Sequence, residues 1–177
     1  MPLLHVPSPV SSFKICSINP TSLRITDNDN VLTTPSVNQV KLENLRILAN
    51  DESIDIIVIS ASWFNENVLI SYVNIPGYND RYRCDRQDGY GGMAFYASTK
   101  LNVRRCEQFE MGTVDNVCIK IELEKHSVYV LGLYRPPKVS SPLFTAFIKD
   151  FEEKVQSILS LISPNDVQII AGDLNVQ

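Results

Sequence analysis

The sequence predicts a layered α/β domain, in which helices cover β-sheets. The predicted elements follow the order strand, helix, strand, several strands, helix, strand. Residues 56–59 and 167–171 form short runs rich in branched apolar residues, which are typical of buried strands. Residues 142–162 carry apolar side chains at the spacing of a long helix with one buried face. Long helices together with buried strands indicate sheets packed against helices.

The composition suits one globular domain. The chain has 177 residues, of which 44% are hydrophobic and 20% charged. Its formal net charge is −4, so the whole-protein field does not attract nucleic acid. If DNA or RNA is the ligand, a local basic patch must bind it.

The cysteines and the N-terminus indicate the compartment. The four cysteines form no CxxC pair and show no metal-ligand spacing, which predicts reduced and mostly buried thiols. Residues 1–12 read as a loose arm rather than a signal peptide, and no apolar run reaches membrane-spanning length. We therefore predict an intracellular protein, nuclear or cytoplasmic, that has no membrane partner.

The first predicted strand covers residues 13–18, and Asn19 and Pro20 end it with turn-forming residues. A polar loop is expected at 26–34. Thr34 as N-cap and Pro35 at the first position then predict a helix, which Asn50 and Asp51 end. Its apolar face is predicted to consist of Val37, Val40, Leu45 and Leu48.

The middle of the chain predicts further strands. Residues 56–59 are expected to be buried on both faces, with residues 60–63 at the carboxyl end of that strand. Residues 81–88 read as a polar loop that contains arginines, and Gly91 and Gly92 lead into a strand at 93–97. Residues 117–123 alternate between apolar and polar, which predicts a half-exposed strand. A hairpin connects it to a return strand at 127–134, which Pro136 and Pro137 end.

The clearest predicted element is the helix over residues 142–162. Ser141 is the predicted N-cap, Pro142 occupies the first position, and Ser163 and Pro164 end the helix. The apolar stripe is interpreted as core, and it comprises Phe144, Phe147, Ile148, Phe151, Val155, Ile158, Leu159 and Ile162.

The last predicted strand, at 167–171, is followed by Gly172-Asp173-Leu174-Asn175. A glycine turn here sets a carboxylate and a carboxamide at the carboxyl end of the strand. Polar groups at such sheet edges often carry function. Asp and Asn are also common turn formers, so this motif alone leaves both interpretations open.

Five segments together resemble the endonuclease/exonuclease/phosphatase superfamily, in particular the apurinic-like endonuclease domain of non-LTR retrotransposons. Residues 13–19 are similar to the family's first strand, which ends in a functional Asn, and residues 55–63 are similar to its D-I-I-x-L-S-E-T-W strand. Residues 85–96 resemble D-R-x-x-x-G-G-G-V-A-I-Y, residues 133–137 match Y-R-P-P, and residues 172–175 match G-D-F-N. The resemblance covers nearly the whole chain in one consistent order. It implies a four-layer α/β sandwich whose second sheet is incomplete here.

The resemblance also implies Mg²⁺-assisted hydrolysis of a DNA phosphodiester. Asp173 would activate the attacking water, and Asn175 would hold Asp173 or the phosphate. Tyr134 would offer its hydroxyl to the phosphate, and Asn19 would support the metal and phosphate cluster. DNA is the implied partner, and a reverse transcriptase domain would follow in a longer product.

Four arginines are candidates for contacts to the DNA backbone. Arg81, Arg83 and Arg86 lie in the predicted polar loop, and Arg135 belongs to the Y-R-P-P motif. An ordinary solvated loop is the alternative interpretation for the first three.

Two departures from the family pattern affect activity. Ala61 occupies the position of the metal-binding Glu, and alanine has no oxygen to offer Mg²⁺. The family's late Asp and His have no counterpart before Gln177, because His5 and His126 do not fall at family positions. We therefore expect residues 13–177 to form a truncated endonuclease domain that is inactive or weakly active. The alternatives are a non-catalytic nucleic-acid-binding module, a non-functional remnant, and a lipid or inositol phosphate phosphatase of the same fold.

Overall fold

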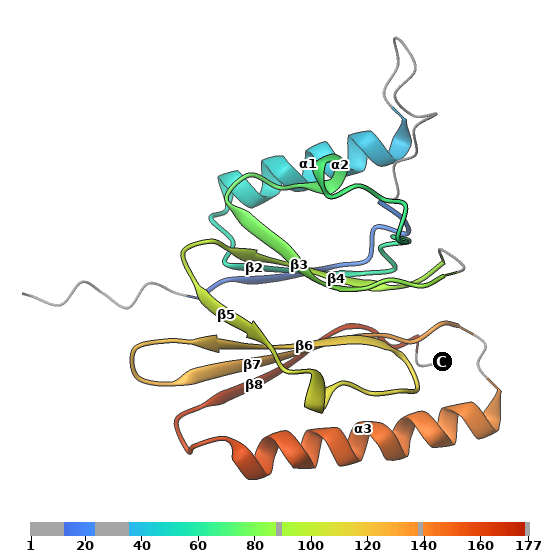
Figure 1. Ribbon diagram of the computed structural model, residues 1–177, viewed down its shortest axis with the longest axis vertical. Helices are drawn as coiled ribbons and strands as arrows, with labels where there is room; N and C mark the ends of the chain where they lie inside the picture. Colours follow the sequence, from blue (N-terminus) through green and yellow to red (C-terminus); the bar gives the residue numbers. More distant parts are fainter. Residues whose placement is uncertain (1–12, 24–35, 88–89, 138–139, 176–177) are drawn as a thin grey trace, which may run out of the picture.

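The computed structural model describes residues 13–23, 36–87, 90–137 and 140–175, without the side chains of residues 70, 80 and 81. Two four-stranded sheets stack face to face, and helices cover the outer face of each sheet (Figure 1). The predicted four-layer α/β sandwich is thus confirmed. The predicted arm at 1–12 and the predicted loop at 26–34 lie outside the described residues.

The first sheet has the strand order β1-β2-β4-β3. Its strands are β1 (Ile15–Ile18), β2 (Ile56–Ser60), β3 (Tyr78–Cys84) and β4 (Met93–Ser98). β1 pairs with β2 in parallel, whereas β4 runs antiparallel to both of its neighbours. Helices α1 (Val37–Asp51) and α2 (Ile70–Val73) lie on the outer face (Figure 1).

The second sheet has the strand order β5-β6-β7-β8. Its strands are β5 (Asn102–Arg105), β6 (Asp115–Glu122), β7 (Ser127–Tyr134) and β8 (Val167–Asp173). β7 pairs with β8 in parallel, and the other pairs are antiparallel. The long helix α3 (Ser141–Leu161) covers the outer face, and the 3₁₀ helix η2 (Glu107–Phe109) connects β5 to β6 (Figure 1).

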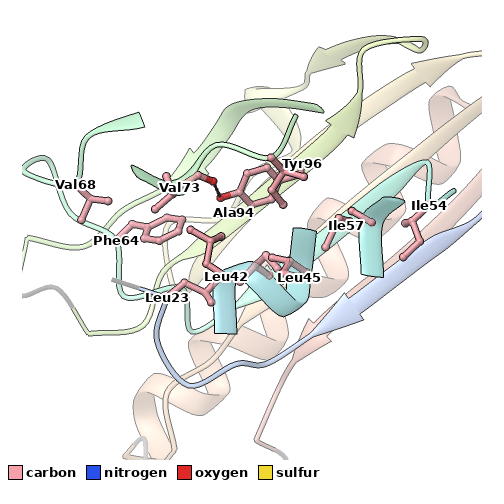
Figure 2. Close-up of a cluster of buried hydrophobic side chains, with 13 residues drawn as sticks. Leu23, Leu42, Leu45, Ile54, Ile57, Phe64, Val68, Val73, Ala94 and Tyr96 are labelled. Atoms are coloured by element: carbon pink, nitrogen blue, oxygen red, sulfur yellow. Dashed lines mark hydrogen bonds between the residues drawn. The ribbon is translucent and has the colours of Figure 1, made fainter. Parts of the chain in front are cut away.

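Three apolar clusters fill the spaces between the four layers. The first lies between α1, α2 and the first sheet, and Figure 2 shows Leu42, Leu45 and Ile57 within it. Tyr96 also belongs to this cluster, and its hydroxyl donates to the carbonyl of Val73 at 2.8 Å (Figure 2). The second cluster lies between the sheets, and the third lies between the second sheet and α3.

The parallel pairs determine where the strand ends meet. β1 and β2 finish at one edge of the first sheet, and β7 and β8 finish at one edge of the second. β1 and β2 also contact β8 across the sandwich. The residues that follow these four strands therefore gather at a single end of the molecule.

The predicted start of the first helix was wrong, and its predicted buried face was right only at Leu45, which is buried, and at Leu48, which is partly buried against the core. Ser36, not Thr34, is the N-cap, and it forms a reciprocal capping box with Gln39. The buried residues are Leu42, Leu45 and Ala49, whereas Val37 is 72% exposed and Val40 is 45% exposed. Each residue turns a helix by about 100°, which places Val40 opposite the buried stripe and Val37, the first residue of the helix, to one side of it.

The polar loop predicted at 81–88 is partly a strand. β3 extends to Cys84 and pairs with β4 at the edge of the first sheet. Tyr82 is 9% exposed, and its hydroxyl donates to the carbonyl of Val103 at 2.8 Å. An edge strand tolerates charged side chains, so its composition resembles that of a loop. The short elements α2 and β5 were not predicted.

The strand predicted at 117–123 as half-exposed is instead largely buried. Residues 116–119 are all buried, because one face of β6 meets the first sheet and the other face meets the layer of α3 and η2. The buried amide of Asn116 is satisfied by backbone groups, since it accepts from Met111 N at 2.8 Å and donates to the Met111 carbonyl at 2.8 Å.

Helix α3 begins one residue earlier than predicted, with Ser140 rather than Ser141 at the N-cap. Phe147 and Ile158 are buried on its inner face, as predicted. Ile148 is 37% exposed and Leu159 is 47% exposed, so these two were assigned to the core incorrectly. Their positions fall on the rim of the buried stripe, because the helix rests on the sheet along a narrow line.

We predict that Gly132→Ala destabilises the fold. A Cβ on Gly132 would lie 2.4 Å from Cε2 of Phe95, which packs on β7 from the opposite sheet. Overpacking of this kind costs about 1–3 kcal/mol in the free energy of unfolding, measurable by urea denaturation. Gly112→Ala is the control, because a Cβ there meets nothing within 4 Å. Equal stability of the two variants would contradict this account of the sheet packing.

Candidate functional site

A hydrogen bond between two polar side chains joins the ends of the two sheets. Asn19 follows β1, and Asp173 is the last residue of β8. The Asn19 Nδ2 donates to Asp173 Oδ2 at 2.6 Å, although the two residues are 154 positions apart. The backbone N–H of Thr21 donates to Asn19 Oδ1 at 3.0 Å, which fixes the orientation of the amide. The structure thus brings together two of the residues that the sequence predicted for one site.

The turn after β8 holds Asp173 in place. Gly172 has φ +130°, and a Cβ there would lie 1.9 Å from the carbonyl oxygen of Leu133, so this position requires glycine. The Asn175 backbone N–H donates to Asp173 Oδ1 at 3.0 Å. The Asn175 side-chain Nδ2 donates to the carbonyl of Arg135 at 2.7 Å. Asn175 therefore braces the carboxylate through the turn and ties the turn to the end of β7.

Tyr134 ends β7 between two carboxylates. In strand register it lies opposite Asp173 on β8 and opposite Asp115 on β6. Burial raises the pKa of the Tyr134 hydroxyl, the charges of Asp173 and Asp115 raise it further, and Arg86 lowers it. The hydroxyl consequently stays protonated at neutral pH and can donate a hydrogen bond.

Ala61 lies at the end of β2, beside the segment that contains Asn19. Its side chain is buried, and its carbonyl accepts from Ser22 N at 2.9 Å. The next residues, Ser62 and Trp63, connect to the glycine turn before β4, since Trp63 N donates to the carbonyl of Gly91 at 2.8 Å. A methyl group thus stands at this strand end, at the position where the family resemblance predicts a carboxylate.

Unusual backbone conformations gather at these strand ends. Six non-glycine residues of the described chain have positive φ, and all but Ser53 lie at the ends of β1, β2 or β8. The five residues at these strand ends are Thr21, Ser22, Ala61, Trp63 and Asn175. Such conformations cost about 1–3 kcal/mol each and cluster where function constrains the chain.

The four candidate arginines have different surroundings. Arg83 pairs with Asp85 and lies over the ring of Phe64 at 4.8 Å. Arg135 is 6% exposed, and its guanidinium donates to the carbonyls of Leu174 and Asn175. Both guanidinium groups are therefore engaged in contacts within the chain.

Arg86 differs from them, because its side chain is 34% exposed and lies 3.6 Å from Asp115. It lines a cleft of about 470 Å³, together with Asp115, Arg135 and Phe147. Arg81 belongs to β3, but its side chain lies outside the described part of the chain. Of the two arginines that line the cleft, Arg86 is thus the more exposed one.

Asp115 and Gly91 were not predicted as site residues. Asp115 Oδ2 accepts from the backbone N–H of Gly92 at 2.9 Å, which links the second sheet to the glycine turn of the first. The sequence does contain a signal, because β7 pairs with β6 through a short hairpin and Asp115 falls directly opposite Tyr134. The strand was predicted to begin at residue 117, so this pairing was missed.

The residues at the strand ends do not fit a divalent cation well. Asp173 uses both carboxylate oxygens in protein hydrogen bonds, and the side-chain oxygen of Asn19 accepts from a backbone N–H. In the described ranges, no group of three or more His, Cys, Asp or Glu side chains could hold a metal ion. Mg²⁺ prefers several oxygen ligands in near-octahedral geometry. We therefore assign no chemical step at this site to a metal.

The cysteines and helices can be compared with the predictions of reduced thiols and of no membrane-spanning segment. All four cysteines are free, with Cys106 and Cys118 buried and Cys16 and Cys84 partly buried. Burial raises the pKa of each of these thiols. Within the ranges that the structure covers, every helix is too short or too polar to cross a bilayer.

No protein-family model matches the chain, and no curated protein matches it in sequence. Several solved structures match it in fold. The endonuclease domain of TRAS1, a telomere-specific non-LTR retrotransposon, is 15% identical with a TM-score of 0.61 over 94% of this chain. The 3′ phosphatase NExo from Neisseria, bound to a product DNA hairpin, is 17% identical with a TM-score of 0.61 over 93%. TDP2 from C. elegans is 14% identical with a TM-score of 0.61 over 79%.

These similarities confirm the fold that the sequence motifs predicted. The chain spans 60% of the length of the TRAS1 domain, 58% of NExo and 44% of TDP2. All three structures share the endonuclease/exonuclease/phosphatase fold.

We predict that Asp173→Asn lowers the pKa of the Tyr134 hydroxyl. The Asp173 carboxylate disfavours the negatively charged tyrosinate, so removing its charge lets the hydroxyl ionise at lower pH. Absorbance titration of the tyrosines, with Tyr134→Phe subtracted, measures the shift. Asp166→Asn is the control, because Asp166 accepts from the backbone N–H of Ser127, at the opposite end of β7 from Tyr134. An unchanged Tyr134 pKa in Asp173→Asn would contradict the described geometry.

Proposed function

We propose that this chain, which has the endonuclease/exonuclease/phosphatase fold, is a DNA-backbone-binding domain of the endonuclease type with weak or no hydrolytic activity. The hydrogen bond between Asn19 and Asp173 is the observation that carries the proposal. It brings the amide of Asn19 to the carboxylate of Asp173, which lies opposite Tyr134 in strand register at this end of the sandwich. Residues 13–177 would form part of a larger domain of this type, upstream of a reverse transcriptase.

Each side chain has a distinct role in this proposal. The Tyr134 hydroxyl donates to a non-bridging phosphate oxygen, because it stays protonated at neutral pH. Arg86 contacts the phosphate from the adjacent cleft, as a guanidinium suits phosphate geometry. Asp173 accepts a proton from an attacking water, and Asn19 and Asn175 hold its carboxylate in position.

Charge explains why the expected activity is weak. The positive charges of Arg86 and Arg135 match the negative charges of Asp115 and Asp173. These four side chains therefore do not offset the negative charge that builds up on the phosphate oxygens during hydrolysis. In the family, a cation bound through the glutamate supplies that compensation. Here Ala61 stands at the position of that glutamate and supplies no oxygen ligand. The site therefore keeps its hydrogen-bond donors to phosphate but lacks a carboxylate that would bind the cation.

DNA binding without efficient cleavage is the expected result of the first test. The wild-type chain should shift duplex DNA in gels with or without Mg²⁺, and binding should weaken as salt rises. Nicking of supercoiled plasmid in Mg²⁺ should be slow or absent, and any nicking should disappear in Asp173→Ala. Failure of the folded chain to bind DNA at low salt would refute the proposal, and rapid nicking would refute its inactivity part. Preferential turnover of a phosphoinositide would instead support the lipid phosphatase alternative.

The matched gain-of-function variant in the same test is Ala61→Glu. Restoring a carboxylate should let Mg²⁺ raise the thermal unfolding midpoint, a readout that does not depend on activity. It should also raise the rate of plasmid nicking above that of the wild type. Glu66→Gln is the control for a nearby carboxylate on the surface. If Mg²⁺ changes the thermal unfolding midpoints of Ala61→Glu and of the wild type equally, Ala61 does not occupy the cation-binding position.

A further inference from the structure

Asp115 occupies a position that the proposed chemistry does not use. It is the first residue of β6, and its side chain is 14% exposed. Its Oδ2 accepts from the backbone N–H of Gly92 at 2.9 Å and lies 3.6 Å from Nη1 of Arg86. One oxygen of the second sheet therefore meets two donors that belong to the connection before β4. A buried carboxylate that is held in this way fixes the groups around it.

Three side chains, those of Asp115, Tyr134 and Arg86, converge on the bare Cα of Gly91. A Cβ on Gly91 would lie 2.8 Å from Cε1 of Tyr134, 2.9 Å from Oδ2 of Asp115 and 3.1 Å from Cδ of Arg86. Gly91 has φ +94°, a conformation that L side chains rarely adopt. The absence of a side chain at this position thus allows Asp115, Tyr134 and Arg86 to pack against one another.

The other side of the glycine turn is attached to the end of β2. The carbonyl of Gly91 accepts from Trp63 N at 2.8 Å, and the ring of Trp63 lies edge-on to Tyr90 at 5.0 Å between centroids. The Asp115 contact therefore joins the β2 end to Tyr134 across the two sheets. It is a second connection between the sheets at this site, separate from that of Asn19 and Asp173.

Asp115 is negatively charged, so direct contact with a phosphate would be repulsive. Its contacts point to an indirect role instead, because Asp115 orients the Arg86 guanidinium and the Gly91–Gly92 turn beside Tyr134. We propose that Asp115 is a positioning residue, which holds Arg86 and the Gly91–Gly92 turn against Tyr134 so that both can receive a DNA phosphate. This inference rests on the proposed function.

The charged groups around Tyr134 give the inference a readout that needs no DNA. Asp173 on β8 and Asp115 on β6 raise the pKa of the hydroxyl, and Arg86 lowers it. Asp115→Asn keeps an oxygen that can accept from Gly92 N–H but removes the charge. The pKa of Tyr134 should therefore fall in this variant if the carboxylate lies where the structure places it.

The test compares Asp115→Asn, Asp115→Ala, Arg86→Ala and the double variant Asp115→Ala/Arg86→Ala. Glu122→Gln is the matched control, because Glu122 ends the same strand and pairs with Lys120 at 3.2 Å. Affinity for a labelled DNA duplex should fall about 10-fold in Asp115→Ala and in Arg86→Ala. The double variant should be no more than about twofold weaker than Arg86→Ala alone, because Asp115 acts through Arg86. The inference would be overturned if the affinity losses of the two single variants multiplied in the double variant. It would also be overturned if Asp115→Ala bound DNA as tightly as Glu122→Gln.

Two spectroscopic measurements separate this inference from the proposed function. Trp63 is the only tryptophan in the chain, so its emission reports on the glycine turn. The Trp63 emission should shift in Asp115→Ala and stay unchanged in Glu122→Gln. The pKa of Tyr134 should fall in Asp115→Asn and stay unchanged in Glu122→Gln. If the wild type binds no DNA, the proposed function fails and these signals alone decide the placement of Asp115. If neither signal responds, the inference fails even when DNA binding is present.

Discussion

The hydrogen bond between Asn19 and Asp173 depends on how the two sheets are built. Each sheet contains one parallel pair, β1 with β2 and β7 with β8, and parallel strands finish at the same edge. The sheets stack with these edges together, so residues 154 positions apart meet at 2.6 Å. The close approach of the sheets in turn requires Gly132, on which the ring of Phe95 rests. The site is therefore a consequence of strand direction and sheet packing together.

The same packing explains why both parts of the site are held by hydrogen bonds and strand pairing. Asp173 is braced by the turn that follows it, and Tyr134 is fixed at the end of a fully paired strand. On the opposite sheet, the ends of β1 and β2 are tied to each other and to the glycine turn. Preorganised donors of this kind can bind a charged ligand without reorganising first. Ala61 offers no oxygen ligand at this strand end, which is why we propose binding rather than efficient catalysis.

The sequence predicted the layered fold and most of the central elements, because their signals are local. Branched apolar runs identified β2 and β8, and the periodic stripe identified α3. The predicted burial of the strand at 167–171 was wrong, because β8 is an edge strand of the second sheet and none of its residues is buried. The edge strand β3 was missed because its exposed face is polar. The buried face of the first helix was predicted only in part, because Val37 and Val40 are exposed apolar residues. Asn19, Tyr134 and Asp173 were predicted through motifs. Asp115 could not be found in this way, since its importance arises from strand pairing and from contacts to Gly92 and Arg86 in the other sheet.

The central claim is that one phosphate of DNA contacts groups from both sheets at the same time. Nuclear magnetic resonance of the side-chain amides, with Asn19 and Asn175 assigned by substitution, tests it most directly. During titration with a short DNA duplex, the Asn19 amide signal and the Tyr134 ring signals should shift together and saturate with one shared Kd. Shifts that are confined to one sheet, or that saturate at different DNA concentrations, would contradict the claim.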